Sequence, residues 1–208
     1  MVRIHPTAII EANVQLGEGT SVWDNAHIRH DAVLGDQCIV GGKSLIAYDV
    51  KIGNRVKINS NTYICNGVTI EDGVMISAGT IFTNDRFPRA TTPDLKTLRS
   101  SDPDEHTLAT VVREGATIGA GCLVGCNLEI GRWAMIGMGS IVTKSVPDFC
   151  LAIGAPARVV GVVCRCGEPV HRFSEDGCSA PVEAICSCGR GYSITGHVVT
   201  ETETTVGV

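Results

Sequence analysis

An aliphatic residue occupies every sixth position of this chain from Ile4 onward. A small or β-branched residue follows each one four positions later, beginning with Ala8. This period of six is neither the 3.6 of a helix nor the two of a single strand. It is typical of a parallel β-helix, in which each hexad forms one short strand and a corner. The series runs Ile4, Ile10, Leu16, Val22, Ile28, Leu34, Val40, Ile46, Ile52, Ile58, Ile64, Ile70 and Ile76, with Phe82 as a larger last member.

The repeat predicts an all-β prism with three flat sides. Three hexads complete one coil, so like positions of successive coils stack at the strand spacing of about 4.8 Å. Aromatic residues make up only 4% of the chain, as a narrow interior requires. The pattern resumes after a break at Val112, Ile118, Val124, Ile130, Ile136 and Val142. We expect corners that need a permissive backbone where glycine follows the aliphatic residue, at Gly17, Gly35, Gly53, Gly119 and Gly131.

The chain divides into three predicted parts. Residues 1–163 form the prism, with a loop insertion at residues 83–111 that is rich in proline and charge. A loop this long inside a compact fold is usually functional. Residues 164–192 form a small C-terminal cysteine-rich appendage, and residues 193–208, rich in Thr and Glu, are expected to be a frayed tail.

Charge and hydropathy exclude several classes of function. The net charge of −5 argues against nucleic-acid binding. No apolar run approaches the roughly 20 residues of a membrane span, and the first ten residues already read as a hexad rather than a signal peptide. We therefore expect a cytoplasmic protein with neither a nucleic acid nor a membrane as partner. Its ten cysteines should then be reduced, and serve as core fillers or metal ligands.

Two cysteine pairs in the appendage indicate a zinc ribbon. Each pair is followed by glycine, in Cys164-Arg165-Cys166-Gly167 and Cys186-Ser187-Cys188-Gly189. Four thiolates suit a closed, structural zinc site, and so small an appendage needs such a staple. The Cys-x-Cys spacing is less common than Cys-x-x-Cys, and Cys178 and His171 are further potential ligands. The alternative is a set of reduced cysteines without metal.

Coil arithmetic places polar side chains in register along one corner. His30, Tyr48, Asn66 and Asn84 are each eighteen residues apart and form one predicted column. Asp31, Asp49, Gly67 and Asp85 form the adjacent one. The first column is either a wall against which substrate lies or a structural ladder of stacked amides. For Asn66 we favour the ladder.

Three motifs together resemble bacterial nucleotide-sugar N-acetyltransferases of the hexapeptide-repeat superfamily. They are the hexads, the loop segment Phe82-Thr83-Asn84-Asp85-Arg86-Phe87-Pro88-Arg89, and the exit segment Gly154-Ala155-Pro156-Ala157-Arg158. The similarity is greatest to enzymes that acetylate UDP-2-acetamido-3-amino-2,3-dideoxyglucuronate. It covers roughly residues 1–163. It implies a left-handed prism, a homotrimer, acetyl-CoA bound between two subunits, and a long loop that reaches over a neighbour.

The resemblance also implies roles for particular residues. Asn84 would contact the sugar amine and orient its lone pair for attack on the thioester, with the leaving thiolate as final proton acceptor. Arg86 and Arg89 suit a diphosphate or a sugar carboxylate, or else pair with acids of their own loop. His106 is a possible general base, although a loop histidine is more often merely solvated. The remaining candidates are Thr83, Asp85 and Asn66 for substrate, and Lys144, Gly154, Pro156 and Arg158 for CoA.

The leading hypothesis is therefore an acetyl-CoA-dependent N-acetyltransferase acting on a UDP-3-amino-uronate. A first alternative keeps the chemistry and replaces the substrate with a dTDP-3-amino-3,6-dideoxyhexose. An alternative of another class is a non-catalytic trimeric β-helix scaffold, such as a carbonic-anhydrase-like zinc protein. That scaffold needs three converging histidines, and the sequence offers no third partner for His27 and His30.

Overall fold

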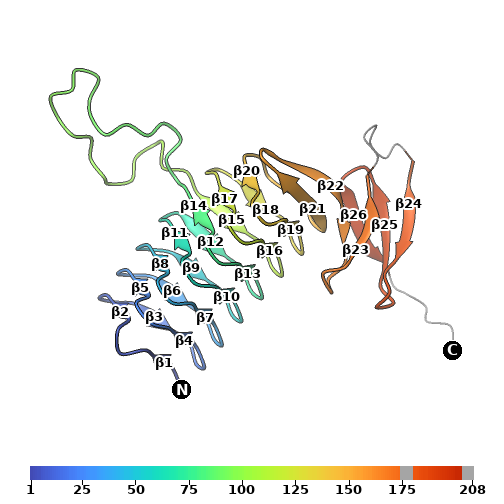
Figure 1. The fold of residues 1–208 in the computed structure, drawn as a ribbon, viewed down its shortest axis with the longest axis horizontal. Coiled ribbons are helices and arrows are strands. Elements are labelled where there is room, and N and C mark those ends of the chain that lie inside the picture. The colour runs from blue at the N-terminus through green and yellow to red at the C-terminus, as the bar shows by residue number, and fades with distance from the viewer. Residues whose placement is uncertain (174–179, 203–208) are drawn as a thin grey trace.

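The computed structural model describes residues 1–173 and 180–202, and every regular element in these ranges is a strand. Short strands wind into an elongated prism that begins at the N-terminus, and a small sheet of longer strands follows at the far end (Figure 1). None of the described residues forms a helix that could cross a membrane. Cys178, considered above as a ligand, lies outside the described residues.

Three parallel sheets form the sides of the prism. Sheet A contains β1 (Arg3–Ile4), β4 (Ser21–Val22), β7 (Ile39–Val40), β10 (Lys57–Ile58), β13 (Met75–Ile76), β16 (Thr117–Ile118), β19 (Met135–Ile136) and β21 (Cys150–Gly154). Sheet B contains β2 (Ile9–Ile10), β5 (His27–Ile28), β8 (Leu45–Ile46), β11 (Tyr63–Ile64), β14 (Ile81–Phe82), β17 (Leu123–Val124) and β20 (Ile141–Val142). Sheet C contains β3 (Gln15–Leu16), β6 (Val33–Leu34), β9 (Lys51–Ile52), β12 (Val68–Ile70), β15 (Thr110–Val112) and β18 (Glu129–Ile130).

The eighteen-residue coil predicted from the hexads is confirmed. Arg3 pairs with Ser21, and Ile10 pairs with Ile28, each one coil further on. The aliphatic positions point into the prism and are almost fully buried from Val22 onward, whereas Ile4 at the open N-terminal end is 48% exposed. The larger Phe82 is also completely buried. Burial of one such side chain contributes roughly 1.5–3 kcal/mol, which explains why the period is so strict.

The glycines that follow the aliphatic residues are required for a reason other than the permissive backbone we expected. Gly17, Gly35, Gly53, Gly119 and Gly131 do not have positive φ angles, so the prediction of permissive corners is wrong for them. A Cβ at Gly35 would lie 2.5 Å from Asn54 Oδ1 and 2.8 Å from the backbone of Gly53 in the next coil. These positions exclude a side chain because successive coils approach each other closely there.

One corner of the prism is held by a ladder of acidic and amide side chains. Asp72 Oδ1 accepts a hydrogen bond from the backbone N–H of Asn54 at 2.8 Å. Asn54 Oδ1 accepts from Asp36 N at 2.9 Å, and Asp36 Oδ1 accepts from Glu18 N at 2.7 Å. Each side chain therefore satisfies a backbone donor of the previous coil, at a corner where the sheet ladder is interrupted.

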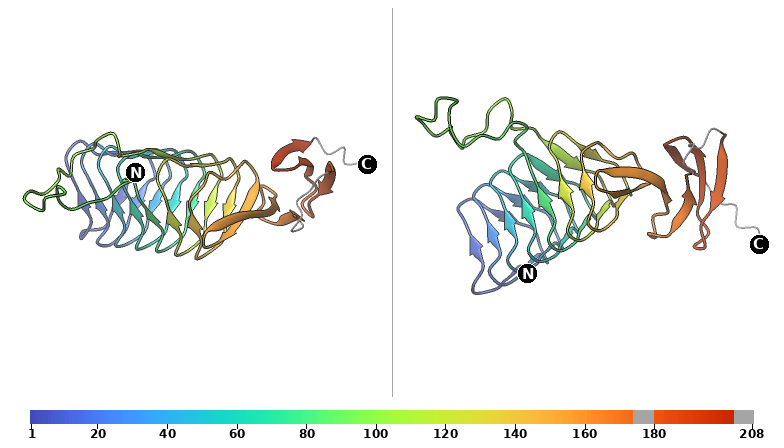
Figure 2. Two further views of the ribbon diagram at one scale, coloured as in Figure 1. Left: turned by 90° about the horizontal axis from the view of Figure 1, so that it is seen from above. Right: turned by 45° about the horizontal axis from the view of Figure 1, so that its top comes forward.

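The loop insertion leaves the prism after β14 and returns before β15. Phe82 pairs with Val124, which lies 42 rather than 18 residues later, so the prism continues in register as if the loop were absent. Leu108 N donates to the carbonyl of Asn84 at 2.8 Å, so the two ends of the loop meet. Between them the chain projects well away from the wall of the prism (Figures 1 and 2).

The appendage closes the C-terminal end of the prism. β21 turns back antiparallel into β22 (Ala157–Val163), which pairs with β23 (Pro169–Arg172). A separate antiparallel sheet follows, made of β24 (Val182–Ile185), β25 (Gly191–Thr195) and β26 (Val198–Thr202). Residues 193–202 are thus mostly strand, and the prediction of a frayed tail is wrong for them because β26 pairs along β25; residues 203–208 lie outside the described ranges.

A second apolar cluster joins this appendage to the prism. Phe149, at the last coil, packs against Tyr192 of β25 with ring centroids 5.5 Å apart. Val199 of β26 contacts both this cluster and the core of the prism. The open edge of the last coil is therefore covered, which protects it from pairing with other chains.

Candidate functional site

The predicted column of polar side chains is present beside sheet B, and it holds Asn84 in one orientation. Asn84 Nδ2 donates to the backbone carbonyl of Asn66 at 3.1 Å, and Asn66 Nδ2 donates to the carbonyl of Tyr48 at 3.0 Å. A carbonyl only accepts, so the NH₂ of each amide must face the previous coil. Asn84 Oδ1 has no donor within residues 1–173 and 180–202, and it remains available to a ligand.

The column continues beyond the loop insertion. Val124 lies above Phe82 and Val142 above Val124, so Cys126 follows Asn84 in register and Lys144 follows Cys126. Cys126 is half-buried and Lys144 is exposed. The sequence predicted Lys144 as a CoA ligand without this alignment. Subtracting the 24 extra residues of the insertion from the residue numbering would have placed Lys144 in the same column as Asn84.

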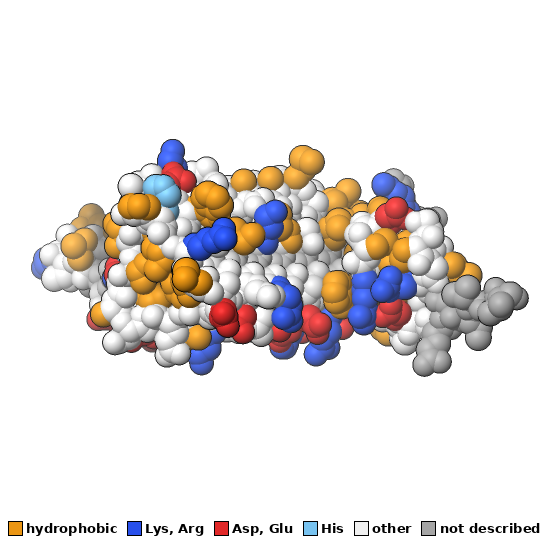
Figure 3. Space-filling view, turned by 90° about the horizontal axis from the view of Figure 1, so that it is seen from below, with side chains coloured by type: hydrophobic (Ala, Val, Ile, Leu, Met, Phe, Trp, Pro, Cys, Tyr) orange, Lys and Arg blue, Asp and Glu red, His pale blue; other side chains and the backbone are white. Residues whose placement is uncertain are grey.

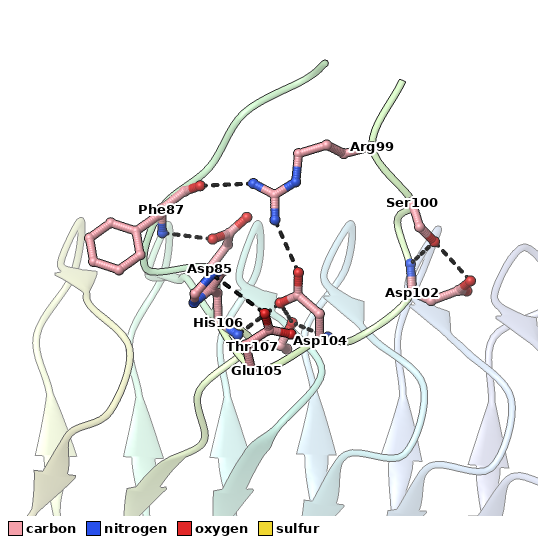
Figure 4. A network of polar contacts seen from close by, with 9 residues as sticks. All are labelled: Asp85, Phe87, Arg99, Ser100, Asp102, Asp104, Glu105, His106 and Thr107. Atoms are coloured by element: carbon pink, nitrogen blue, oxygen red, sulfur yellow. Dashed lines mark hydrogen bonds and ion pairs between the residues drawn. The ribbon is translucent and has the colours of Figure 1, made fainter. Parts of the chain in front are cut away.

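The base of the loop is a network of backbone and charged groups (Figure 4). Asp85 Oδ1 accepts from Phe87 N at 2.8 Å. Arg99 joins the outgoing and returning segments of the loop. Its Nη1 donates to the Phe87 carbonyl at 3.1 Å, and its Nη2 pairs with Asp104 Oδ2 at 3.0 Å. The backbone N–H of His106 and then the Arg99 guanidinium hold the pKa of Asp104 below its usual value. Oδ1 of Asp85 is therefore used within the loop, and Arg99 is a residue that sequence reasoning missed.

The candidate residues of the loop line two different cavities. A cavity of about 120 Å³ is lined by Tyr48, Asn84, Asp85, Arg89, residues 99–104 and Thr107. A larger one of about 680 Å³ lies inside the loop and includes Arg86, Phe87 and His106. Arg89 lines both. The structure thus brings Asp85 and Arg89 to the cavity of Asn84 and places Arg86 and His106 in a different group.

The remaining loop candidates have contacts of their own. The rings of His106 and Phe87 meet edge-on, with their centroids 5.4 Å apart. The Arg86 guanidinium also lies 5.4 Å from the centroid of the Phe87 ring. Thr83 Oγ1 donates to the Val124 carbonyl of the next coil at 3.3 Å. These contacts stabilise the loop and its attachment to the prism.

The candidate CoA residues of the exit segment form the turn between β21 and β22. Gly154 has a φ of 102°, a conformation that favours glycine, and its N–H donates to Ser140 Oγ at 3.1 Å. The Ala155–Pro156 peptide bond is cis. Arg158 is exposed, and its Nη1 donates only to the neighbouring Ala157 carbonyl at 2.9 Å in the described part of the chain.

The four predicted cysteines converge on one point. The sulfur atoms of Cys164, Cys166, Cys186 and Cys188 all lie within 4.8 Å of one another. Cys164 Sγ is 3.4 Å from Cys188 Sγ, and Cys166 Sγ is 3.5 Å from Cys186 Sγ. Tetrahedral zinc with Zn–S bonds of about 2.3 Å separates its ligands by roughly 3.8 Å, so the donor set fits this metal. His171 is not among the converging groups; it packs on Phe173.

Each cysteine pair lies in a matching tight turn. Gly167 N donates to the Cys164 carbonyl at 2.8 Å, and Gly189 N donates to the Cys186 carbonyl at 2.9 Å. Both glycines have positive φ angles, 95° and 91°. The requirement for glycine after each pair is therefore conformational, and the Cys-x-Cys spacing is sufficient because the turns face each other.

Polar neighbours contact Cys164 and Cys188 of this centre. The buried Tyr192 hydroxyl donates to Cys164 Sγ at 3.1 Å, and Arg190 Nη1 lies 3.6 Å from Cys188 Sγ. The Arg190 backbone N–H and guanidinium lower the pKa of Cys188 to about 6. At Cys166 and Cys186 a backbone hydrogen bond is outweighed by desolvation and by the neighbouring thiols, which raise the pKa of both. Metal ligation requires deprotonated sulfur, so the surroundings of Cys188 are compatible with a bound cation.

A prism of stacked hexads with an ordered polar column at a long loop defines the class of hexapeptide β-helix transferases. The family model described as the GMPPB C-terminal domain matches residues 1–88. A dTDP-3-amino-3,6-dideoxy-alpha-D-galactopyranose 3-N-acetyltransferase from Aneurinibacillus thermoaerophilus is 44% identical over 198 residues, covering 95% of this chain and 94% of that protein. The chain belongs to the hexapeptide-repeat acyltransferase family and is an acyltransferase.

Solved structures and a shorter match agree with this family. AntD, an N-acyltransferase from Bacillus cereus solved in complex with dTDP and 3-hydroxybutyryl-CoA, superimposes with a TM-score of 0.54 at 20% identity, over 79% of this chain and 81% of that one. The serine acetyltransferase of Escherichia coli strain K12 is 52% identical over 50 residues, 24% of this chain and 18% of that one. The likeness to AntD confirms the left-handed parallel β-helix that the motifs implied.

Proposed function

We propose that this protein transfers the acetyl group of acetyl-CoA to the 3-amino group of a dTDP-3-amino-3,6-dideoxyhexose. The observation that carries the proposal is the 44% identity, over nearly the whole of both chains, to an enzyme named for that reaction. The UDP-3-amino-uronate favoured by the motifs alone becomes the second candidate, because the matched relative is named for a dTDP sugar. AntD, whose structure contains dTDP and an acyl-CoA, supports the same pair of substrate classes.

Asn84 would hold the acceptor amine. Its Oδ1 is free and fixed in direction by the bond from Nδ2 to the Asn66 carbonyl, so it can accept one N–H of a neutral amine and aim the lone pair. The amine nitrogen then bonds to the thioester carbon, the carbon–sulfur bond breaks, and the amine proton passes to the departing CoA thiolate. Positioning of two bound substrates supplies much of the rate in such a transfer.

Acetyl-CoA would approach from the C-terminal end of the column. Lys144 lies in the column two coils beyond Asn84. Arg158 lies on β22, directly after the exposed turn at Gly154 and Pro156. Two exposed cations suit the phosphates of CoA. The nucleotide sugar would then occupy the N-terminal side of Asn84.

A homotrimer would place this site between subunits. The outward-facing residues of sheet B are almost all apolar: Ile9, Leu45, Tyr63, Ile81, Leu123 and Ile141, with His27 as the exception. Sheet C instead presents Gln15, Val33, Lys51, Thr69, Val111 and Glu129, of which only Val33 and Val111 are apolar. The side along which sheet A runs mixes apolar patches with charged side chains (Figure 3). A face depleted of charge is typical of a subunit interface, and Asn84 lies at the edge of this one.

The four-cysteine centre would hold a structural zinc ion. When bound, zinc would cross-link the turn after β22 to the turn before β25. Cys164, Cys166, Cys186 and Cys188 would be its ligands, and four thiolates leave no position for substrate or water. Tyr192 connects the centre to the apolar cluster that covers the prism, so the metal would stabilise the cap.

A thiol-release assay tests the proposed reaction. Purified protein is incubated with acetyl-CoA and either a dTDP-3-amino-3,6-dideoxyhexose or a UDP-3-amino-uronate, and free CoA and the acetylated sugar are measured. We expect turnover with the dTDP sugar to exceed that with the UDP uronate. Turnover with the uronate alone would assign the second candidate, and no acetyl transfer to either sugar would reject the proposal.

A further inference from the structure

The lower end of the column carries a group of polar side chains that the acetyl transfer described above does not use. His30 and Tyr48 are stacked in parallel, with ring centroids 5.2 Å apart and an angle of 8° between the planes. The guanidinium of Arg29 lies 5.4 Å from the centroid of the Tyr48 ring. All three side chains are partly exposed.

Carboxylates fix Arg29 and His30, and these two side chains in turn contact the Tyr48 ring. Glu11 Oε1 pairs with His27 Nε2 at 2.6 Å and accepts from Arg29 Nε at 3.3 Å, and Glu11 Oε2 accepts from the backbone N–H of His30 at 3.0 Å. His30 Nδ1 is paired with Asp31 Oδ2 at 2.8 Å. These contacts use Nε of Arg29 and Nδ1 of His30, and they leave the more distal atoms of both side chains open.

Three outer groups remain without hydrogen-bond partners in the described part of the chain. They are the Nη atoms of Arg29, the hydroxyl of Tyr48 and Nε2 of His30. A guanidinium edge and a phenol that are held in place by other contacts are suited to a phosphate group, because each can donate a hydrogen bond to it. The His30 ring uses Nδ1–H on Asp31, so its Nε2 donates to a phosphate only when the ring carries both protons. Holding these groups in advance reduces the entropy lost on binding.

The group is continuous with the candidate acetyl-transfer site. Tyr48 lines the same cavity as Asn84, and the loop arginines Arg89 and Arg99 face that cavity too. Tyr48 lies two coils from Asn84, about 10 Å at the stacking distance of parallel strands. An extended nucleotide sugar presents its amino sugar, its diphosphate and its nucleoside in that order. The column presents the Asn84 amide, then Tyr48 with Arg29, then His30.

We propose that Arg29, His30 and Tyr48 form the binding site for the diphosphate of the nucleotide substrate. The inference rests on the proposed function, since it assigns one part of the same substrate. It directs the nucleotide toward the N-terminal coils and leaves the C-terminal coils to CoA. The ligand class is a pyrimidine nucleoside diphosphate, joined through its second phosphate to the sugar.

Direct binding of dTDP to the full-length protein tests this site, by isothermal titration calorimetry with Arg29→Gln, Tyr48→Phe and a control, Arg55→Gln. Arg55 forms a comparable ion pair with Asp72 at another corner. We expect Arg29→Gln to weaken dTDP binding about tenfold and Tyr48→Phe, which keeps the stacked ring, about fivefold. Arg55→Gln should bind dTDP as the wild type does. In the acetylation assay KM for the nucleotide sugar should rise with kcat within about twofold, the pattern of lost ground-state binding.

Two results would overturn the inference, and both are distinct from failure of the proposed function. Wild-type affinity for dTDP in both Arg29→Gln and Tyr48→Phe would reject the site. A lower molar mass of Arg29→Gln by light scattering would show instead that the arginine holds subunits together, and would also reject it. If the wild type binds dTDP through these residues but acetylates no dTDP amino sugar, the proposed function is wrong and the diphosphate site stands.

Discussion

The amide of Asn84 is held by the backbone carbonyl of Asn66, one coil earlier, through a hydrogen bond of 3.1 Å from Nδ2. The same contact recurs between Asn66 and Tyr48 at 3.0 Å. A repeated structural contact therefore orients a side chain whose other polar atom is free. The ladder and the functional interpretation of this column, posed as alternatives from the sequence, are compatible with each other.

Replacement of Asn84 should separate these two roles. Asn84→Ala removes the free Oδ1 and should lower kcat about 100-fold, at the low end of the effect of removing one oriented polar group. Asn66→Ala removes only a lower step of the ladder and should cost about 1 kcal/mol of stability with a smaller kinetic effect. Steady-state kinetics and thermal unfolding measure both. An Asn84→Ala variant with wild-type kcat would remove Asn84 from the site.

Replacement of His106 should leave most activity. Its ring packs on Phe87 in the cavity inside the loop rather than in the one beside Asn84, so it is not placed to take the amine proton. We expect kcat of His106→Ala to stay within about threefold of the wild type, whereas loss of a general base costs 10²–10⁴-fold. A loss of a thousandfold would instead identify His106 as the base.

A charge on sheet B should dissociate the proposed trimer. Leu123 faces outward from β17 and is 41% exposed in the single chain. Leu123→Asp would bury an unpaired carboxylate in the interface, which is strongly unfavourable. The matched control is Thr69→Asp, outward on β12 of sheet C, which should keep the wild-type mass. Light scattering coupled to size exclusion measures the mass. A monomeric wild type would contradict the trimer itself.

Removal of one cysteine of the four-cysteine centre should release the metal. We expect one zinc per chain by elemental analysis, and loss of it in Cys188→Ser together with a fall in Tm of more than about 5 °C, the shift from roughly 2 kcal/mol at this chain length. Cys122→Ser is the control, because Cys122 Sγ donates to the Gly137 carbonyl at 3.2 Å and Ser140 Oγ already makes the same contact at 2.7 Å. Freshly purified protein without zinc would end the assignment.

The corner ladder should make stability depend on pH in the acid range. The backbone N–H and side-chain amide of Asn54 hold the pKa of Asp72 below its usual value. A lowered folded-state pKa contributes stability above the unfolded value of about 3.9, and the contribution is lost as pH falls through the lower folded value. Denaturant unfolding should show that Asp72→Asn flattens the decline of stability below about pH 4. Asp49→Asn should leave the slope unchanged, because the Asp49 backbone N–H donates to the His30 carbonyl but its carboxylate makes no hydrogen bond in the described part of the chain.

The sequence predicted the prism because every coil obeys one rule. Burial of Ile28, Ile46 and Ile64 at identical positions follows from a period that no other fold produces. The polar column followed from the same count. The four-cysteine centre was found from residue type and spacing alone, because both turns close locally at Gly167 and Gly189.

What the sequence did not predict depends on contacts outside the repeat. Arg99 joins Phe87 and Asp104, two residues of the loop that only the path of the loop brings together. β26 completes a sheet with β25, although its Thr and Glu composition is typical of a disordered tail. The grouping of Arg29, His30 and Tyr48 needed the rotamers that Glu11 and Asp31 impose.

The loop leaves and rejoins the wall at adjacent positions, so its length is uncoupled from the rest of the molecule. The Leu108–Asn84 backbone bond closes its base, and the coils above and below stack directly on each other. Residues can be added or lost between Arg86 and Thr107 without rotating any later side chain onto the wrong face. Within a hexad, in contrast, a single insertion would shift every following residue. Insertions, deletions and substitutions can therefore accumulate in this one segment while the stacked coils keep their register.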